Sequence, residues 1–256
     1  QVANSPQQTS ALLHSLQTAL FWLFDGGAND AVGNLLGRLP VALAGALIVL
    51  LPWYWRNVLG RWAALALAVL LAFDPWLLTL SRLADGAMLS AAFGLAALTA
   101  LHVATGNARV EKSNMGSGAA ASIAIGLLLA SGAYAWPWLL IVVSFALIVE
   151  PVGVRALIHP RNLLVLGAAL VLGATTLLAQ PDSLRVVSAS LGAWLQRFGG
   201  SEYGLGWLVI RLLVDSPLLM IAALTGIIQS WRLNMVNARL RLWLTLWLVL
   251  ALLLLV

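Results

Sequence analysis

The chain has 256 residues, of which 62% are hydrophobic and only 9% are charged. Soluble domains carry about 25% charged residues, so this composition excludes an ordinary soluble domain and predicts an all-α protein that crosses a membrane several times. The chain has a net charge of +5. In a membrane protein, an excess of Lys and Arg usually marks the cytoplasmic loops, so we expect no nucleic-acid partner.

Residues 1–37 are predicted to be the end of a first external loop that carries a surface helix. In "SALLHSLQTALFWLF", Ser10 to Phe24, leucines recur at helical spacing and Ser10 is suited to cap the helix. We expect this helix to lie on the membrane surface. Ser183–Phe198 has a similar pattern and falls in a second external loop, residues 182–204.

Charged residues separate the apolar stretches of residues 38–256, which we expect to form a transmembrane bundle. Each stretch is near the roughly 20 residues that a helix needs to cross the hydrocarbon core. Asp74 interrupts the second one. The predicted spans are Leu39–Trp55, Trp62–Ser81, Gly86–Ala108, Asn162–Pro181, Ser216–Trp231 and a last one from Leu242 onward.

One uncharged stretch, Ser113–Val149, is too long for a single membrane helix and short for two. Gly132 and Pro137 both disfavour continuous helix. We therefore predict a pair of short helices within residues 118–149, which meet near Gly132 as a tight hairpin or as a re-entrant pair. With this pair the bundle would have about eight membrane segments.

The basic residues favour this topology, because cytoplasmic loops carry the excess of Lys and Arg. With two helices in residues 118–149, nine of the 14 basic residues fall on one side and five on the other. With one helix there, the split would be seven against seven. We therefore expect a multi-pass protein of the inner or plasma membrane, with residues 1–37 outside. The five outer basic residues are Arg38, Arg82, Arg185, Arg197 and Arg211.

Five charged residues map to the outer ends of the predicted spans and are the candidate site: Asp74, Arg82, Asp85, Arg211 and Asp215. One interpretation is that they lie at the interface, reach water and pair with each other. The other is a polar cavity that opens outward. There, an arginine could hold a lipid phosphate, and a carboxylate could accept a proton or orient a divalent cation.

Other sites have little support in the sequence. The chain has no cysteine, which excludes disulfides and cysteine metal ligands. GxGxxG, P-loop and HExxH motifs are also absent. His14, His102 and His159 are far apart along the chain, which argues against a three-histidine metal site.

The order of segments resembles the GT-C superfamily of membrane glycosyltransferases, in the branch of protein O-mannosyltransferases and aminoarabinose transferases. Each motif is weak alone, but together they cover most of the chain in order. The matching stretches are "SPQQTSALLHSLQTALFWLFDG", "LGRLPVALAGALIVLLPWYW", "FDPWLLTLSRLADGAM", "GLLLASGAYAWPW" and "LLVDSPLLMIAALTGII".

This resemblance implies an inverting transferase that uses a polyprenyl-phosphate sugar as donor on the outer face. Arg82 matches the family's Ser-Arg arginine, which would hold the lipid phosphate. The second family acid would stand at Ala87, whereas Asp85 lies two positions earlier, and Asp215 is one position from the family's acid at Ser216.

The family's catalytic acid follows the first membrane helix. Both would lie before Gln1, so we expect the chain to be a piece of a longer protein, truncated at both ends. Two alternatives remain open, namely a multi-pass transporter or lipid-carrier flippase, and a catalytically silent GT-C-like subunit. Membrane lipid is an expected partner.

Overall fold

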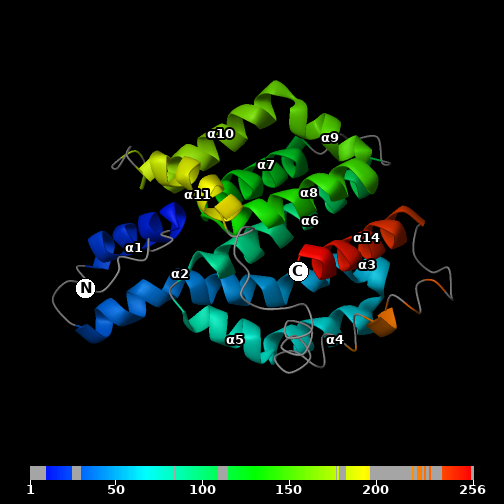
Figure 1. Ribbon diagram of the computed structural model, residues 1–256, viewed down its shortest axis with the longest axis horizontal. Helices are drawn as coiled ribbons and strands as arrows, with labels where there is room; N and C mark the ends of the chain where they lie inside the picture. The colour runs from blue at the N-terminus through cyan, green and yellow to red at the C-terminus, as the bar shows by residue number, and fades with distance from the viewer. Residues whose placement is uncertain are drawn as a thin grey trace.

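The computed structural model describes residues 10–24, 30–83, 85–108, 115–176, 178, 183–196, 221, 224–226, 228, 231 and 238–254, and their regular secondary structure is entirely helical (Figure 1). The all-α prediction is therefore confirmed for this part of the chain. The helices are α1 (Ala11–Phe24), α2 (Asp30–Leu50), the 3₁₀ helix η1 (Leu51–Trp55), α3 (Arg56–Leu59), α4 (Arg61–Ala72), α5 (Pro75–Arg82), α6 (Gly86–Ala108), α7 (Met115–Ala130), α8 (Ala135–Ile148), α9 (Pro151–Ile158), α10 (Pro160–Ala174), α11 (Leu184–Gln196) and α14 (Ala238–Leu254).

Helix α1 begins as the sequence predicts. The hydroxyl oxygen of Ser10 accepts a hydrogen bond from the backbone N–H of Leu13 at 3.1 Å, which is an N-cap bond that satisfies one of the free N–H groups of the first turn. The next helix, α2, already begins at Asp30. The predicted boundary between residues 37 and 38 therefore lies inside continuous helix.

The predicted span Trp62–Ser81 is divided into two helices, α4 and α5. Pro75 has no N–H to donate and its ring restricts the preceding residue to extended backbone, and Asp74 has ψ 120°. The carboxylate of Asp74 then caps α5 by accepting from the N–H of Leu77 at 2.8 Å. The Asp-Pro pair therefore ends one helix and starts the next, at the interruption that the sequence indicated within residues 62–81.

Helix α6 has the bounds that the charge pattern predicts, and α7 and α8 pack against it. In the turn after α7, the Ser131 hydroxyl lies 2.6 Å from that of Ser90 near the start of α6. Glu150, just after α8, contacts His102 in the second half of α6 at 3.3 Å. Helix α7 is therefore antiparallel to α6 and α8 is parallel to it. The two form a hairpin that turns at Gly132, where φ is 105°, so the predicted helix pair is confirmed.

Helix α10 runs parallel to α7 at close range. Gly126 of α7 faces Leu166 and Ala169, and Gly173 of α10 faces Leu127 and Ala130. Small residues allow helix backbones to approach this closely. Helix α10 ends at Ala174, short of the predicted end of its span at Pro181, and Thr176 beyond it has φ 52°.

The core is organised around α6. One cluster of buried residues joins α6 to α7, α8 and α14, and includes Phe145 and Trp243. A second cluster joins α6 to α1, α2 and α10, and includes Leu12 and Met88. Helix α11, which covers most of the predicted surface helix Ser183–Phe198, is tied to the start of α8 by a 3.0 Å hydrogen bond from Trp136 Nε1 to the Ser190 hydroxyl.

Two helical stretches among the described residues are long and apolar enough to cross a membrane, namely Val32–Trp55 with 24 residues and Gly86–Ala104 with 19. Helices α4, α7, α8, α10 and α14 are shorter, with between 12 residues in α4 and 17 in α14. At about 1.5 Å per residue they are roughly 18–26 Å long, less than the hydrocarbon thickness of about 30 Å. Within the described residues, two helices are therefore candidates for crossing a membrane, and the bundle of about eight segments stays a prediction.

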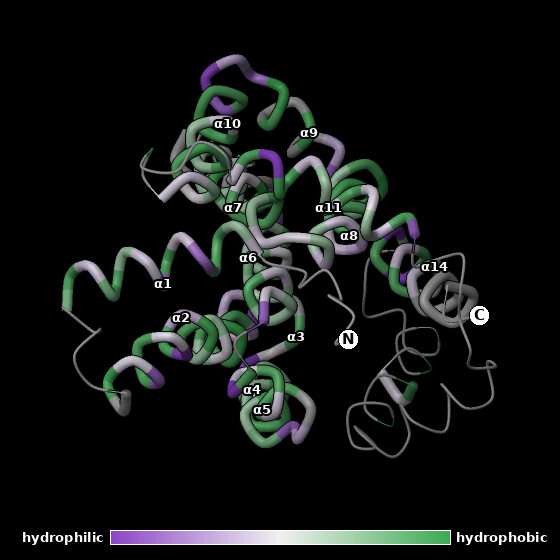
Figure 2. Tube along the Cα trace, turned by 60° about the vertical axis from the view of Figure 1, so that its left-hand side comes forward, coloured by the Kyte–Doolittle hydropathy of each residue, from purple (hydrophilic) through white to green (hydrophobic). Residues whose placement is uncertain are grey.

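Many large apolar side chains nevertheless face outward. Trp62 is 82% exposed, Phe73 is 77% exposed and Leu164 is 75% exposed. Figure 2 shows hydrophobic residues along most of the helices, with hydrophilic ones mainly at turns and helix ends. This distribution differs from a soluble helical protein, in which the outward faces of helices are polar.

Candidate functional site

The segment from Asp74 to Gly86, which links α4, α5 and α6, carries three of the five predicted site residues. Asp74 is only 5% exposed and its carboxylate is the N-cap of α5. Arg82 is in the last turn of α5 and is exposed. Asp85 is half-buried, and its carboxylate accepts from the N–H of Gly86 at 2.6 Å, at the first residue of α6.

These three charges do not pair with one another. The one ion pair found within the described part of the chain joins His102 and Glu150, and none forms between Asp74, Arg82 and Asp85. From Asp74 to Arg82 helix α5 rises about 12 Å, which places the two side chains at opposite ends of the helix. The interpretation that the predicted site residues form mutual ion pairs is therefore wrong for these three.

Arg211 and Asp215, the other two predicted site residues, lie outside the described residues, so their predicted role stays a prediction.

Asp85 stands where several chain segments meet. A Cβ atom on the neighbouring Gly86 would lie 2.5 Å from the carbonyl oxygen of Ser131 and 2.6 Å from Cβ of Ser10. Glycine is therefore required at this contact between the start of α6, the start of α1 and the turn before α8. The three helix N-termini carry partial positive charge, which favours an anion nearby.

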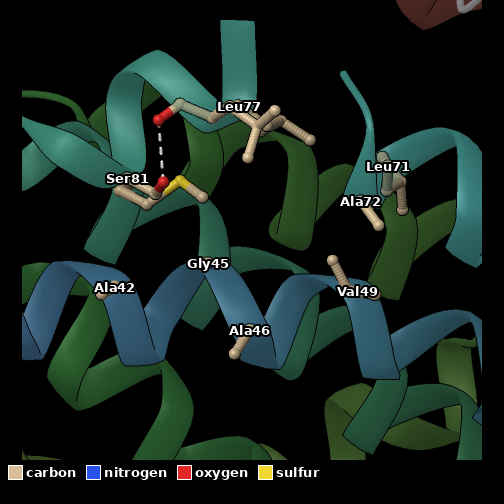
Figure 3. A pocket seen from close by; sticks show the side chains of 10 residues that line it. Ala42, Gly45, Ala46, Val49, Leu71, Ala72, Leu77 and Ser81 are labelled. Carbon is tan, nitrogen blue, oxygen red and sulfur yellow. Dashed lines mark hydrogen bonds between the residues drawn. The ribbon is translucent and has the colours of Figure 1, made fainter. Parts of the chain in front are cut away.

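An apolar groove adjoins the Arg82 end of α5 (Figure 3). It has a volume of about 250 Å³ and lies between α2, α4, α5 and the start of α6. Gly45 forms part of its floor, because a Cβ there would lie 3.0 Å from Cε of Met88 and 3.1 Å from Cβ of Ser81. The Ser81 hydroxyl donates to the Leu78 carbonyl at 2.8 Å. The lining residues are Ala42, Gly45, Ala46, Val49, Leu71, Ala72, Leu77, Leu78, Ser81 and Met88.

Arg82 directly follows Ser81, which lines the groove, and is not itself one of the lining residues. No hydrogen bond or ion pair engages its side chain among the described residues, and the side chain is exposed. A guanidinium with free donors beside an apolar groove can bind an anionic group whose attached hydrocarbon occupies the groove.

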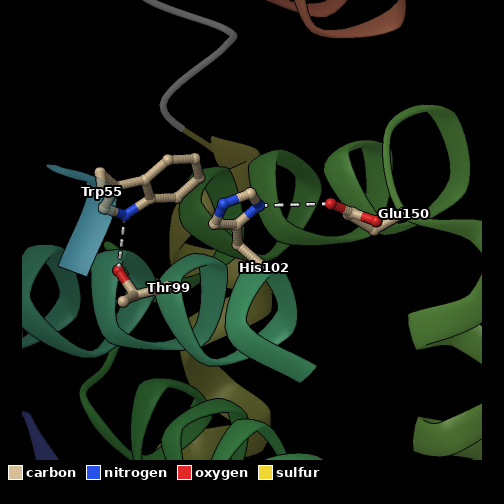
Figure 4. Close-up of polar contacts among 4 residues, drawn as sticks. All are labelled: Trp55, Thr99, His102 and Glu150. Carbon is tan, nitrogen blue, oxygen red and sulfur yellow. Dashed lines mark hydrogen bonds and ion pairs between the residues drawn. The ribbon is translucent and has the colours of Figure 1, made fainter. Parts of the chain in front are cut away.

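The structure also shows a polar cluster that the sequence did not predict (Figure 4). The Trp55 indole N–H donates to the Thr99 hydroxyl at 3.0 Å, and the indole stacks on the His102 ring at 4.4 Å between centroids. His102 Nδ1 lies 3.3 Å from Glu150 Oε1. The cluster ties η1 to α6 and to the α8–α9 junction. From Gly86 to His102 helix α6 rises about 24 Å, so the cluster is remote from Asp85.

Sequence reasoning had a partial signal for this cluster, because His102 is the only titratable residue between Gly86 and Ala108. The partner could not be inferred, since Glu150 is 48 residues away.

The two described carboxylates of the candidate site, those of Asp74 and Asp85, do not belong to a metal-binding group of described residues. Among the residues that the structure describes, no group of three His, Asp or Glu side chains could hold a metal ion. Asp74 and Asp85 each use a carboxylate oxygen to accept a backbone N–H. We therefore assign no step to a metal.

Comparison of the chain with protein-family models, with curated proteins and with solved structures found no match. The resemblance to GT-C transferases therefore stays a prediction that rests on the motifs quoted above.

Proposed function

We propose that the protein is an integral membrane glycosyltransferase of GT-C type that transfers a sugar, with inversion, from a polyprenyl-phosphate donor to an acceptor on the outer face. The observation that carries the proposal is the exposed Arg82, which follows the groove-lining Ser81 and has no ion-pair partner among the described residues. A polyprenyl phosphate has the matching chemistry, an anionic head on a long hydrocarbon.

In this proposal the groove holds the hydrocarbon next to the phosphate, and Arg82 holds the phosphate by charge-assisted hydrogen bonds. When an acceptor hydroxyl attacks the anomeric carbon from the opposite face, its proton passes to a carboxylate that acts as general base. The sugar–phosphate bond breaks, and the polyprenyl phosphate leaves with both bonding electrons. Arg82 stabilises the charge that develops on this leaving phosphate. The N-termini of α1, α6 and α8 add partial positive charge at the same end of the bundle.

The proposed topology has about eight membrane segments in the inner or plasma membrane. The alternating directions of α6, α7 and α8 support it, because successive membrane helices connected by short turns must reverse direction. In this topology the shorter helices cross with the help of their flanking turns. The outward-facing apolar side chains then contact lipid.

The test is substitution of Arg82 in the complete membrane-embedded protein. Arg82→Ala should raise the KM for a polyprenyl-phosphate sugar about tenfold or more, because a hydrogen bond to a charged group contributes about 1.5–3 kcal/mol. Arg82→Lys should recover part of the loss, since lysine keeps the charge without the planar fork. Arg185→Ala, at an exposed arginine of α11, is the matched control and should leave KM unchanged.

Unchanged binding and turnover in Arg82→Ala would remove Arg82 from the site. Movement of the donor between the two leaflets of a vesicle membrane, without sugar transfer, would instead support the flippase alternative. Donor binding without turnover would support the silent subunit.

The groove is tested separately. Val49 lines the groove, and Leu50, the next residue, is 64% exposed and does not line it. Val49→Phe should therefore weaken donor binding by filling the groove, whereas Leu50→Phe should not. Equal donor affinity in the two variants, measured with a fluorescent polyprenyl phosphate, would contradict the assignment of the groove.

A further inference from the structure

The apolar groove beside α5 separates two parts of the fold that are held in place differently. On one side is α2, whose inward face belongs to the core. Val41 is 0% exposed and Ile48 is 1% exposed. The Gln17 side-chain amide of α1 also donates to the Gly37 carbonyl of α2 at 2.8 Å. Burial and interhelical hydrogen bonding therefore fix α2 to its neighbours.

On the other side of the groove are α4 and α5, residues 61–82, which we call the α4–α5 arm. Figure 1 shows the arm at the edge of the described helices. Among the described side chains of α4 and α5, only Ala64 is buried. The side-chain hydrogen bonds of Asp74, Thr79 and Ser81 all end within the arm. Because membrane helices associate through packing and interhelical hydrogen bonds, the arm is held less firmly than α2.

The arm is joined to the rest of the chain by a non-helical residue at each end. Before α4, Gly60 has φ 87° and ψ 152°, which is a conformation that side-chain-bearing residues rarely adopt. A Cβ at Gly60 would meet no atom within 4 Å, so no neighbour restrains this position. After α5, Leu83 is extended, with ψ 132°. Residues at the ends of elements that absorb changes in φ and ψ are the usual hinges of moving segments.

The two walls of the groove differ in the size of their side chains. Ala42 and Gly45 line it on α2, and Leu71 and Leu77 line it on the arm (Figure 3). The closest approach of the two walls is at Gly45, where a Cβ would lie 3.1 Å from Cβ of Ser81. The small residues of α2 leave a volume of about 250 Å³ that the leucines of the arm do not fill. Rotation of the arm about this contact would change the width of the groove.

We propose that the α4–α5 arm is a lid on the groove. The arm turns about Gly60 and Leu83, opens to admit a hydrocarbon chain from the side, and closes its leucines onto that chain. A bound chain supplies the apolar contacts that the small residues of α2 do not give the leucines, so it shifts the arm towards the closed arrangement. The inference rests on the proposed function only for the identity of the chain, a polyprenyl group.

The absence of native cysteine allows a direct test with pairs of spin labels in the full chain. Leu65→Cys on α4 and Leu164→Cys on α10 report the position of the arm, and both side chains are exposed, at 39% and 75%. The control pair is Leu43→Cys on α2, 61% exposed, with the same Leu164→Cys. Pulsed electron paramagnetic resonance in lipid nanodiscs gives the distance distribution of each pair, without ligand and with polyprenyl phosphate or uncharged polyprenol.

We expect a broad distribution between positions 65 and 164 that narrows and shifts with either probe, because the arm responds to hydrocarbon. The distribution between positions 43 and 164 should be narrow and unchanged. A narrow distance between positions 65 and 164 that neither probe alters would overturn the lid, as would an equal shift in the control pair. A response to polyprenyl phosphate but not to polyprenol would also overturn it, since the phosphate rather than the chain would then move the arm.

The hinge is tested by Gly60→Ala in the same labelled chain. Alanine disfavours φ 87°, so the distribution between positions 65 and 164 should shift without ligand. Gly167→Ala in α10 is the control and should leave it unchanged. Equal distributions in the two variants would exclude Gly60 as a hinge. An arm that responds to polyprenol in a protein without sugar transfer would contradict the proposed function and support the lid, whereas sugar transfer with a rigid arm would do the reverse.

Discussion

Glycine at single positions sets how closely the helices approach. A Cβ on Gly126 would lie 2.6 Å from the Leu166 carbonyl oxygen and 2.8 Å from the Ala169 methyl group. Gly94 is similar, because a Cβ there would lie 2.5 Å from the ring of Trp138. These distances are below van der Waals contact, so a methyl group requires either helix to move.

We predict that Gly126→Ala lowers the free energy of unfolding by about 1–3 kcal/mol, because the methyl group overpacks against backbone of α10. The matched control is Gly167→Ala in α10, where a Cβ meets nothing within 4 Å. That change should raise the free energy of unfolding by up to about 1 kcal/mol, since alanine favours helix. Denaturant titration in micelles, followed by circular dichroism, compares the two; the same sign for both would refute the packing explanation.

At the scale of elements, one Asp-Pro pair separates α4 from α5, and both helices line the apolar groove. Asp74 is buried and uses its carboxylate as a helix cap, although the sequence indicated a polar site residue. Its role in binding stays a prediction, and the structure supplies a separate reason for an acid or amide at this position.

We predict that Asp74→Ala lowers the free energy of unfolding by about 1 kcal/mol, which is the typical cost of losing an N-cap. Asp74→Asn should be close to wild type in stability, because asparagine caps a helix as well as aspartate. Thermal unfolding in detergent measures both variants. If the asparagine variant were as unstable as the alanine variant, the carboxylate charge would matter to folding beyond its capping bond. If the asparagine variant were stable but bound donor poorly, the charge would belong to the site.

At the scale of the whole molecule, α14 packs against α8 through two tryptophans that donate hydrogen bonds to the same serine hydroxyl. Ser144 of α8 accepts the indole N–H of Trp243 at 3.0 Å and that of Trp247 at 2.7 Å. Trp243 also packs edge-on against Phe145, with 5.0 Å between ring centroids. About a hundred residues separate the partners, so this contact depends on the complete fold.

We predict that Ser144→Ala loosens α14 and lowers the free energy of unfolding by about 2 kcal/mol, because a buried donor without an acceptor costs about 1–3 kcal/mol. Ser188→Ala is the control, since Ser188 is exposed and its hydroxyl donates to the Arg185 carbonyl within α11. It should change stability by less than about 0.5 kcal/mol. Faster proteolysis near α14 in Ser144→Ala alone is the expected result, and equal rates in both variants would contradict it.

Local patterns were sufficient for several features of the fold. The Ser10 cap, the bounds of α6 and the helix break near Gly132 follow from hydrogen bonding and backbone restrictions within a few residues of one another. The division of α4 from α5 falls at Asp74 and Pro75, which the sequence already indicated as the end of a span. Helix lengths were overestimated where an apolar stretch continues past the end of a helix, as it does after Ala174.

The sequence by itself determined the all-helical class, most helix positions and the apolar character that calls for lipid, because these depend on composition and on contacts between near neighbours. Only the tertiary structure decided which residues meet. It separated Asp74 from Arg82, placed Arg82 beside a groove, and joined Ser15 to Ala174 across 159 residues and His102 to Glu150 across 48. Apolar helices of similar composition can pack in many arrangements, and the one adopted depends on where small residues permit close approach and where buried polar groups find partners.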